Sequence, residues 1–179
     1  MRFILMRSIV LMLALSVGII FFIGCGSEEE LVVQDVQFET DDGLTLAGTV
    51  YSPKATEKLP GVVFAHMYQN SRASWAEYAS ELAKQGFVTM AFDFRAWGES
   101  EGDTLDVPNL HKDVIAAVQF LANLNRVDRH RIGVVGASMG GMAAVTAASK
   151  TQLIKAVATV SAPPAWEGSE PVEVVGEIS

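Results

Sequence analysis

A serine lies between two glycines at residues 136–140, where the sequence reads Gly-Ala-Ser-Met-Gly. The residues just before it, 131–136, form a short apolar run that predicts a buried strand, and small, helix-compatible residues follow. A G-x-S-x-G sequence in this context is typical of a sharp turn that lifts the serine hydroxyl above the strand end. We therefore predict that Ser138 is a nucleophile. The backbone N–H of Met139 and the positive end of the following helix would stabilise a developing oxyanion.

The same pattern of strand, glycines and helix could instead form the phosphate-binding loop of a nicotinamide-binding domain. That loop has the sequence G-x-G-x-x-G. Counted from Gly136, its second glycine would fall at position 138, which is Ser138. An acidic residue for the ribose is also missing from residues 156–161. The single cysteine, Cys25, excludes CxxC metal sites. The sequence therefore favours the serine nucleophile, and we expect no cofactor and no metal.

A serine hydroxyl needs a general base, and the base needs an orienting carboxylate. All three histidines, His66, His111 and His130, precede Ser138 in the chain. We expect His66 to be a structural hydrogen-bonding residue, with service as the base as the alternative. His111 opens a predicted helix. His130 precedes a buried strand, which places it at the end opposite Ser138.

Glutamates at positions 167 and 170 follow the last predicted strand and could supply the carboxylate. Residues 162–179 contain four glutamates and no basic residue, however, which is typical of a solvated segment.

The elements that would position these residues alternate between strands and helices. Residues 31–39 and 44–51 alternate in hydrophobicity around a turn and predict a β-hairpin. Continuous apolar runs predict buried strands at residues 61–65, 87–92, 131–136 and 155–161. Helical spacing predicts helices at residues 74–85, 107–124 and 140–149. We therefore expect an α/β fold, in which the hairpin leads into a mostly parallel sheet with helices on both faces.

Residues from about 31 to 164 resemble the N-terminal two-thirds of an α/β-hydrolase. Besides Ser138, residues 66–68 (His-Met-Tyr) resemble the family's oxyanion turn, and residues 93–100 resemble its D-x-R-x-x-G-x-S loop. The resemblance implies that the backbone N–H of Tyr68 is the second oxyanion donor, beside Met67, where glycine is usual. The resemblance also implies that residues 93–100 brace the loops at the strand ends.

The resemblance implies a serine hydrolase that acts on carboxylic esters or related acyl substrates. In that family the acid and the histidine of the triad follow the nucleophile, on loops after two further strands. This chain stops before those strands, so we expect a truncated hydrolase that is weak or inactive alone. The alternative is a non-catalytic, membrane-tethered module that retains the pocket to bind a small molecule.

The first 25 residues predict targeting to a membrane. Arg2 and Arg7 form a basic start before an apolar run at 9–23 that is short for a spanning helix. Residues 22–25 (Phe-Ile-Gly-Cys) resemble the lipobox of bacterial lipoproteins, which implies acylation of Cys25. The alternative is an uncleaved signal anchor. Either way, we expect the protein to be anchored to a membrane of the cell envelope, outside the cytoplasm.

The composition agrees with one globular domain behind this segment. Half of the 179 residues are hydrophobic, 19% are charged, and the net charge of −8 disfavours nucleic-acid binding. The expected boundaries are a signal segment (1–24), a tether (25–30), the hydrolase-like core (31–164) and an acidic tail (165–179).

Overall fold

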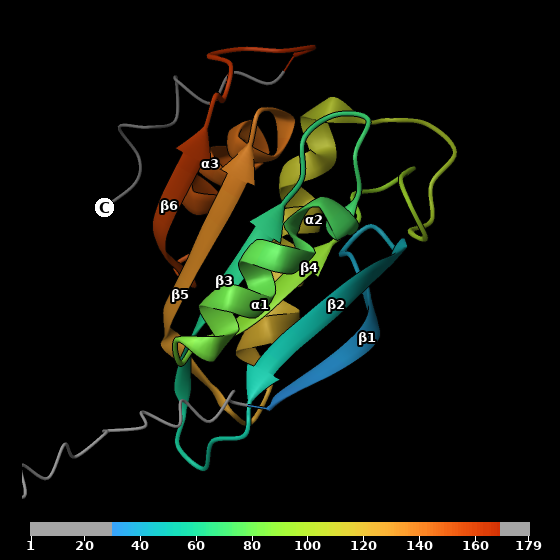
Figure 1. The fold of residues 1–179 in the computed structure, drawn as a ribbon. Coiled ribbons are helices and arrows are strands. Elements are labelled where there is room, and N and C mark those ends of the chain that lie inside the picture. Colours follow the sequence, from blue (N-terminus) through green and yellow to red (C-terminus); the bar gives the residue numbers. More distant parts are fainter. Residues whose placement is uncertain (1–29, 169–179) are drawn as a thin grey trace, which may run out of the picture.

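Six strands form one mixed sheet in the computed structural model, which describes residues 30–168 (Figure 1). The strands are β1 (Leu31–Glu39), β2 (Thr45–Pro53), β3 (Leu59–Ala65), β4 (Val88–Phe92), β5 (Val127–Ala137) and β6 (Ile154–Val160). The helices are α1 (Ala76–Lys84), α2 (Leu110–Ala122) and α3 (Met139–Lys150). Short 3₁₀ turns, Arg72–Trp75 and Val107–Asn109, precede α1 and α2. Cys25 and Glu170 lie outside the described residues.

The strands lie in the order β1-β2-β4-β3-β5-β6. β1 and β2 form the antiparallel hairpin that the sequence predicts, and β2 also pairs antiparallel with β4. β4, β3, β5 and β6 are parallel to one another. Ala65 at the end of β3 pairs with Phe92 and with Gly136, so the carboxyl ends of the three central strands lie at one edge. The predicted fold class, a partial α/β-hydrolase fold, is confirmed.

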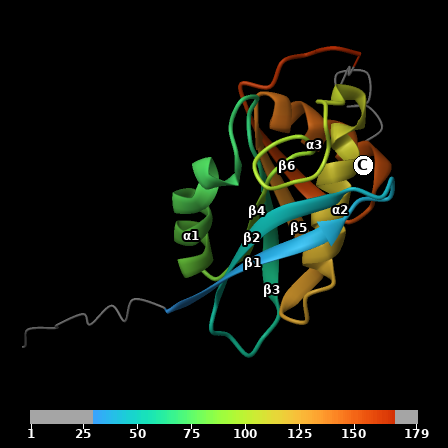
Figure 2. The same ribbon diagram turned by 90° about the vertical axis from the view of Figure 1, so that its right-hand side faces the viewer.

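Helices cover both faces of the sheet, as Figure 2 shows, with α1 on one face and α2 and α3 on the other. α2 buries the apolar stripe that its sequence predicts: Leu110, Val114, Ala117, Val118 and Leu121 are at most 1% exposed. α1 buries only Ala79 and Ala83, because its remaining side chains face solvent or lie at its margins. None of the helices within residues 30–168 is long and apolar enough to cross a membrane.

Two expectations about the strands are wrong in detail. The last strand was expected to be buried on both faces, but in β6 only Ile154 is buried, and Val160 is 54% exposed. The reason is position, because β6 lies at the edge of the sheet and α1 packs on β2 and β4 instead. β5 begins four residues earlier than its apolar run, because Val127 pairs with Leu59.

Candidate active site

The backbone of Ser138 is strained at the junction between β5 and α3. Its φ is 48° and its ψ is −115°, a region that residues with a side chain rarely adopt. The Ser138 N–H donates to the carbonyl of Val160 at 2.8 Å, and the Ser138 carbonyl accepts the first hydrogen bond of α3, from Met142 N–H at 3.1 Å. The residue therefore sits at the tight strand-to-helix turn that the glycine spacing predicts.

The flanking glycines allow elements to approach more closely than any side chain would permit. A Cβ at Gly136 would lie 2.6 Å from the backbone nitrogen of Gly141, inside the first turn of α3. A Cβ at Gly140 would lie 2.6 Å from the carbonyl oxygen of His66. The start of α3 is thus pressed against the end of β3, which brings Ser138 and the turn at 66–68 to the same place.

The two backbone groups predicted as oxyanion donors come from these adjoining elements. Met139 is the first residue of α3, so its N–H has no partner within the helix and lies at the positive helix end. Tyr68 belongs to the turn after β3. Its ring packs edge-on against Trp97 and Trp166, each with a centroid distance of 5.3 Å. Neither aromatic contact was anticipated from the sequence.

His66 is fully buried, and the backbone occupies both of its ring nitrogens. Nε2 accepts a hydrogen bond from Phe94 N–H at 3.1 Å, and Nδ1 lies 2.7 Å from the carbonyl oxygen of Met67. This pair of contacts requires the neutral ring with its proton on Nδ1. Burial lowers the pKa of His66, against the opposing effects of the Met67 carbonyl and Asp93. His66 thus ties the loops after β3 and β4 together.

The other candidate residues come from α2, from β5 and from the segment after β6. His111 is the second residue of α2, where its Nδ1 lies 2.8 Å from the carbonyl oxygen of Pro108. His130 is exposed near the amino end of β5, whereas Ser138 follows the carboxyl end. Glu167 is exposed and has a φ of 45°.

Backbone strain gathers at the edge of the sheet that carries Ser138. Each of the four parallel strands is followed by a non-glycine residue with a positive φ: Gln69 (56°), Ala96 (64°), Ser138 (48°) and Ser161 (54°). Strained residues of this kind cluster at functional sites, where surrounding contacts hold them. The sequence gives no signal for three of the four, because only Ser138 is flanked by glycines at the spacing of a known turn.

The loop after β4 is braced around Asp93, as the resemblance implies. The buried Asp93 carboxylate pairs with the Arg72 guanidinium and accepts the backbone N–H groups of Arg72 at 2.7 Å and Glu99 at 3.1 Å. A Cβ at Gly98 would lie 2.8 Å from Asp93 Oδ1, which explains the glycine in the motif. Ser100 Oγ donates to the Asp93 carbonyl at 2.6 Å and fastens the loop to β2.

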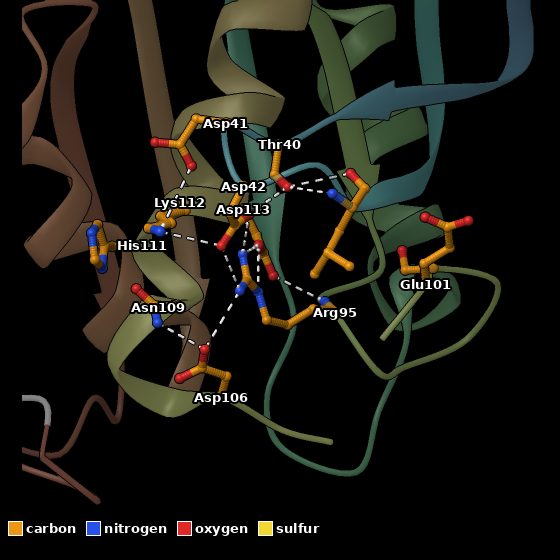
Figure 3. A network of polar contacts seen from close by, with 12 residues as sticks. Thr40, Asp41, Asp42, Arg95, Glu101, Asp106, Asn109, His111, Lys112 and Asp113 are labelled. Carbon is orange, nitrogen blue, oxygen red and sulfur yellow. Dashed lines mark hydrogen bonds and ion pairs between the residues drawn. The ribbon is translucent and has the colours of Figure 1, made fainter. Parts of the chain in front are cut away.

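Arg95 is the centre of a second, largely buried network (Figure 3). Its guanidinium donates to Asp113 at 2.6 and 2.8 Å and to Asp42 at 3.0 and 3.2 Å, and Asp106 lies 3.7 Å away. Sequence reasoning missed these partners, although a charged Asp113 inside an apolar helix was a usable signal. Burial raises the pKa of Asp113, and the hydrogen bonds from Arg95 oppose that rise. Like Asp93, this network holds loops in place.

An apolar pocket of about 310 Å³ opens next to the strained serine. It is lined by Met67, Ser74, Trp75, Tyr78, Ala137 and Val160. Ala137 immediately precedes Ser138, and Met67 immediately precedes Tyr68. The pocket therefore adjoins both the serine and the turn predicted to donate to an oxyanion. No group of three or more metal-ligating side chains occurs within residues 30–168.

Comparison with known proteins identifies relatives of the described region. Residues 42–170 match the family of X-Pro dipeptidyl-peptidases (S15 family). An uncharacterised protein of Pseudomonas aeruginosa, PA2218, is 38% identical over 69% of this chain and 35% of its own length. Its crystal structure superposes with a TM-score of 0.69 over 72% of this chain and 42% of that one.

Two further relatives have names that describe an activity. The thiohydrolase aneE of Aspergillus aculeatus is 32% identical over 74% of this chain and 42% of its own length. The structure of the Pyrococcus furiosus esterase Pf2001 is 31% identical, with a TM-score of 0.60 over 71% of this chain and 51% of that one. This chain thus spans about a third to a half of the length of the relatives that it matches.

Proposed function

This chain belongs to the X-Pro dipeptidyl-peptidase (S15) family, and we propose that it acts on carboxylic esters or related acyl substrates with Ser138 as the nucleophile. The strained backbone of Ser138 carries this proposal. Strain of this kind persists only where surrounding contacts enforce it, and the contacts of Gly136 and Gly140 do so here. The enforced turn presents a hydroxyl beside the N-terminus of a helix.

The proposed reaction uses backbone groups for charge stabilisation. The Ser138 hydroxyl attacks the acyl carbon, and the carbonyl oxygen becomes an oxyanion that accepts hydrogen bonds from Met139 N–H and Tyr68 N–H. The proton that the Ser138 hydroxyl loses leaves with the departing group, and water then hydrolyses the acyl-serine to the free acid and restores the hydroxyl. The positive end of α3 adds to the stabilisation because it faces the same charge.

The family and the two named relatives favour acyl transfer, but they do not indicate which leaving group the substrate carries. A thiohydrolase, an esterase and a dipeptidyl-peptidase attack a thioester, an ester and an amide, respectively. All three reactions pass through the same tetrahedral oxyanion. We therefore propose an activated aryl ester as the first substrate to test, because its leaving group needs the least help from a proton donor.

We propose that this chain alone turns over slowly. Backbone groups occupy both ring nitrogens of His66, and His111 Nδ1 contacts the Pro108 carbonyl oxygen. His130 lies near the amino end of β5, whereas Ser138 follows its carboxyl end. The experiment is the initial rate of hydrolysis of an activated aryl ester by the wild type and by Ser138→Ala, with folding checked by circular dichroism.

We expect a rate barely above buffer and a change of less than about tenfold in Ser138→Ala, equivalent to about 1.4 kcal/mol. Ser80→Ala removes a partly exposed hydroxyl of α1 that donates to the Glu77 carbonyl; it is the matched control and should leave the rate unchanged. Brisk turnover that Ser138→Ala abolishes would show that a base exists, and His66 and then Glu167 would be the next residues to mutate.

A second candidate function is a non-catalytic module that binds a small molecule beside Ser138. The backbone hydrogen bonds of His66 favour it, because they leave no ring nitrogen for proton transfer. Reaction with a fluorophosphonate separates the two functions. Covalent addition at Ser138, detected by peptide mass spectrometry and absent from Ser138→Ala, supports the nucleophile. Ligand binding without any such addition supports the module.

We also propose that Cys25 is acylated and tethers the protein to a membrane of the cell envelope, outside the cytoplasm. The support is the sequence of residues 1–25, with its basic start, apolar run and terminal cysteine. The test compares the intact mass and the membrane fraction of the wild type and Cys25→Ala in a bacterial host. Equal mass and equal partitioning of the two proteins would contradict acylation and leave the signal anchor as the alternative.

A further inference from the structure

We infer that the pocket beside Ser138 binds a straight hydrocarbon chain of the substrate. This inference rests on the proposed function, because it places the chain next to the proposed nucleophile. Ala137 lines the pocket and is joined to Ser138 by a peptide bond, while Met67 lines it next to Tyr68. A substrate whose acyl carbon lies at Ser138 has this pocket within reach of its next few atoms.

The lining disfavours a charged occupant. Five of its six side chains are apolar or aromatic, and none carries a charge. The sixth, Ser74, donates its hydroxyl proton to the Ser71 carbonyl at 2.8 Å, so that donor is already used. The rings of Trp75 and Tyr78 meet edge-on with their centroids 5.6 Å apart and form an aromatic wall. An alkyl chain is the occupant that such a surface binds best.

Exposure of the lining supports an occupant rather than an empty surface. Met67 and Tyr78 are 45% and 64% exposed and lie beside Val160, which the edge position of β6 leaves 54% exposed. Large apolar side chains seldom gather at one exposed place without a binding role. These three side chains come from the turn after β3, from α1 and from β6, so the fold assembles this surface from three distant segments. Covering them with a hydrocarbon removes apolar area from water, which favours binding.

A polar hollow elsewhere on the molecule provides a contrast. It measures about 450 Å³ and includes Arg72, Asp93 and Glu99 in its lining. Those charges are paired with one another, through the Arg72 contacts to Asp93 and Glu99. The hollow thus offers a ligand little that is not already bonded within the protein, whereas the lining of the apolar pocket holds no charged pair.

The size of the pocket sets the expected chain length. Its volume of about 310 Å³ is near the lower end for small-molecule sites. At roughly 30 Å³ for each water-sized group, it holds a chain of up to about ten heavy atoms. Each methylene that moves from water into the pocket should tighten binding about fourfold until the pocket is full.

The test measures binding to the full-length chain, so it does not depend on turnover. Straight-chain carboxylates and primary alcohols of increasing length are titrated against protein labelled with ¹³C at the methionine methyl groups. The signal of Met67, assigned with Met67→Leu, should shift, whereas those of the fully buried Met90 and Met142 should not. A length dependence in the carboxylate series assigns the pocket to the acyl group, and one confined to the alcohols assigns it to the leaving group.

Matched variants control for fold and surface charge. Val160→Asp places a carboxylate in the pocket and should weaken binding of the longest chain more than tenfold. Val33→Asp makes the same change on β1 at a residue of similar exposure, 56%, and should not alter binding. If Val160→Asp fails to fold, Tyr78→Ala on the outside of α1 serves instead, with an expected loss of several-fold.

The outcomes separate this inference from the proposed function. Length-dependent binding that persists in Ser138→Ala, without fluorophosphonate labelling of the wild type, supports the pocket and contradicts the nucleophile. Labelling of Ser138 with no dependence on chain length supports the nucleophile and overturns the pocket assignment. Equal binding by Val160→Asp and Val33→Asp would also overturn it, and would leave the exposed side chains as a contact surface for protein.

Discussion

The loops after β5 and β4 lie at the same edge of the sheet but are held in different ways. Residues 132–149, which contain Ser138, include no charged side chain at all. Their geometry comes from glycines that allow close backbone approach and from hydrogen bonds between backbone groups. Residues 93–100 instead depend on charged side chains, since Asp93 and Arg95 each bind several partners. The proposed nucleophile, Ser138, lies in the loop without charges.

The cluster of buried charges and the proposed nucleophile therefore lie in different loops. The network around Arg95 has the largest concentration of ion pairs within residues 30–168, yet its partners lie at the hairpin turn and the start of α2. Its contacts fix where the strand-end loops lie. The chemistry we propose depends on a neutral hydroxyl and two backbone N–H groups, which only a precise backbone can align. Three substitutions and one titration test this contrast between the two loops.

The largest effect is expected from Arg95→Met. Arg95 is 3% exposed and Asp113 is 0% exposed, so the substitution leaves a buried carboxylate without its cation. Breaking a buried pair in this way destabilises a protein by about 3–5 kcal/mol. The free energy of unfolding is measured by urea denaturation. Arg131→Met is the control, because its ion pair with Asp128 is on the surface and should be worth less than about 1 kcal/mol.

A loss below about 1 kcal/mol in Arg95→Met would contradict the bracing role and remove the contrast between the two loops.

Gly140→Ala should destabilise the protein by about 1–3 kcal/mol, because the new Cβ meets the backbone of β3 and of the turn that follows it. Backbone atoms have little room to move aside. Gly133→Ala is the control within β5, since its Cβ would lie 3.5 Å from the nearest atom, the Ala156 carbonyl oxygen. Thermal and urea unfolding of the two variants provide the measurement. Similar stability of the two would mean that the approach of α3 to β3 is not what shapes the turn.

Ser138→Gly should stabilise the protein by about 1 kcal/mol while removing the nucleophile. Glycine relieves backbone strain of about 1–3 kcal/mol at a φ of 48°. Its greater conformational freedom in the unfolded chain opposes this gain by about 0.5–1 kcal/mol. Ser138→Ala is the comparison, since alanine keeps a Cβ and therefore the strain. Both variants are compared by urea denaturation. Should the alanine variant gain as much as the glycine variant, the stabilisation would have a source other than backbone strain.

The elements and the serine turn were predictable because their signals are local. Glycine spacing identified the turn at Ser138, and the apolar stripe identified α2 nearly to its ends. The structure also confirms the alternation of strands and helices and the family resemblance built on it. Each of these features depends on residues that are close together in the sequence, so a single sequence displays the pattern directly.

The partners of Arg95 and the pocket were not predictable, because they join distant segments. Asp42 and Asp113 lie 53 and 18 residues from Arg95 in the sequence, and no local pattern links them. The exposure of Val160 follows from the place of β6 at the sheet edge, whereas its apolar run suggested burial. The pocket requires α1, β6 and the turn after β3 together. Such features depend on the order of the strands.

The smallest effect concerns the protonation of His66. Burial lowers its pKa, so on acidification the unfolded chain takes up a proton at this histidine before the folded chain does. Stability is therefore lost as the pH falls through the unfolded pKa of about 6.5. The contribution of this one residue is at most about 0.7 kcal/mol between pH 7 and pH 6. The chain has two other histidines, so the His66 ring is best observed directly by ¹H–¹⁵N NMR.

We expect Nδ1 to carry the proton at pH 7, Nε2 to remain an acceptor for Phe94 N–H, and the midpoint to lie below 6.5. A ring that is protonated on Nε2 at pH 7, or that titrates above 6.5, would mean that the backbone contacts are broken in solution. The ring would then be free to accept a proton from Ser138. In that case a titrating side chain would take part in the reaction together with the uncharged loop at Ser138. Both the proposal of slow turnover and the contrast between the two loops would then be wrong.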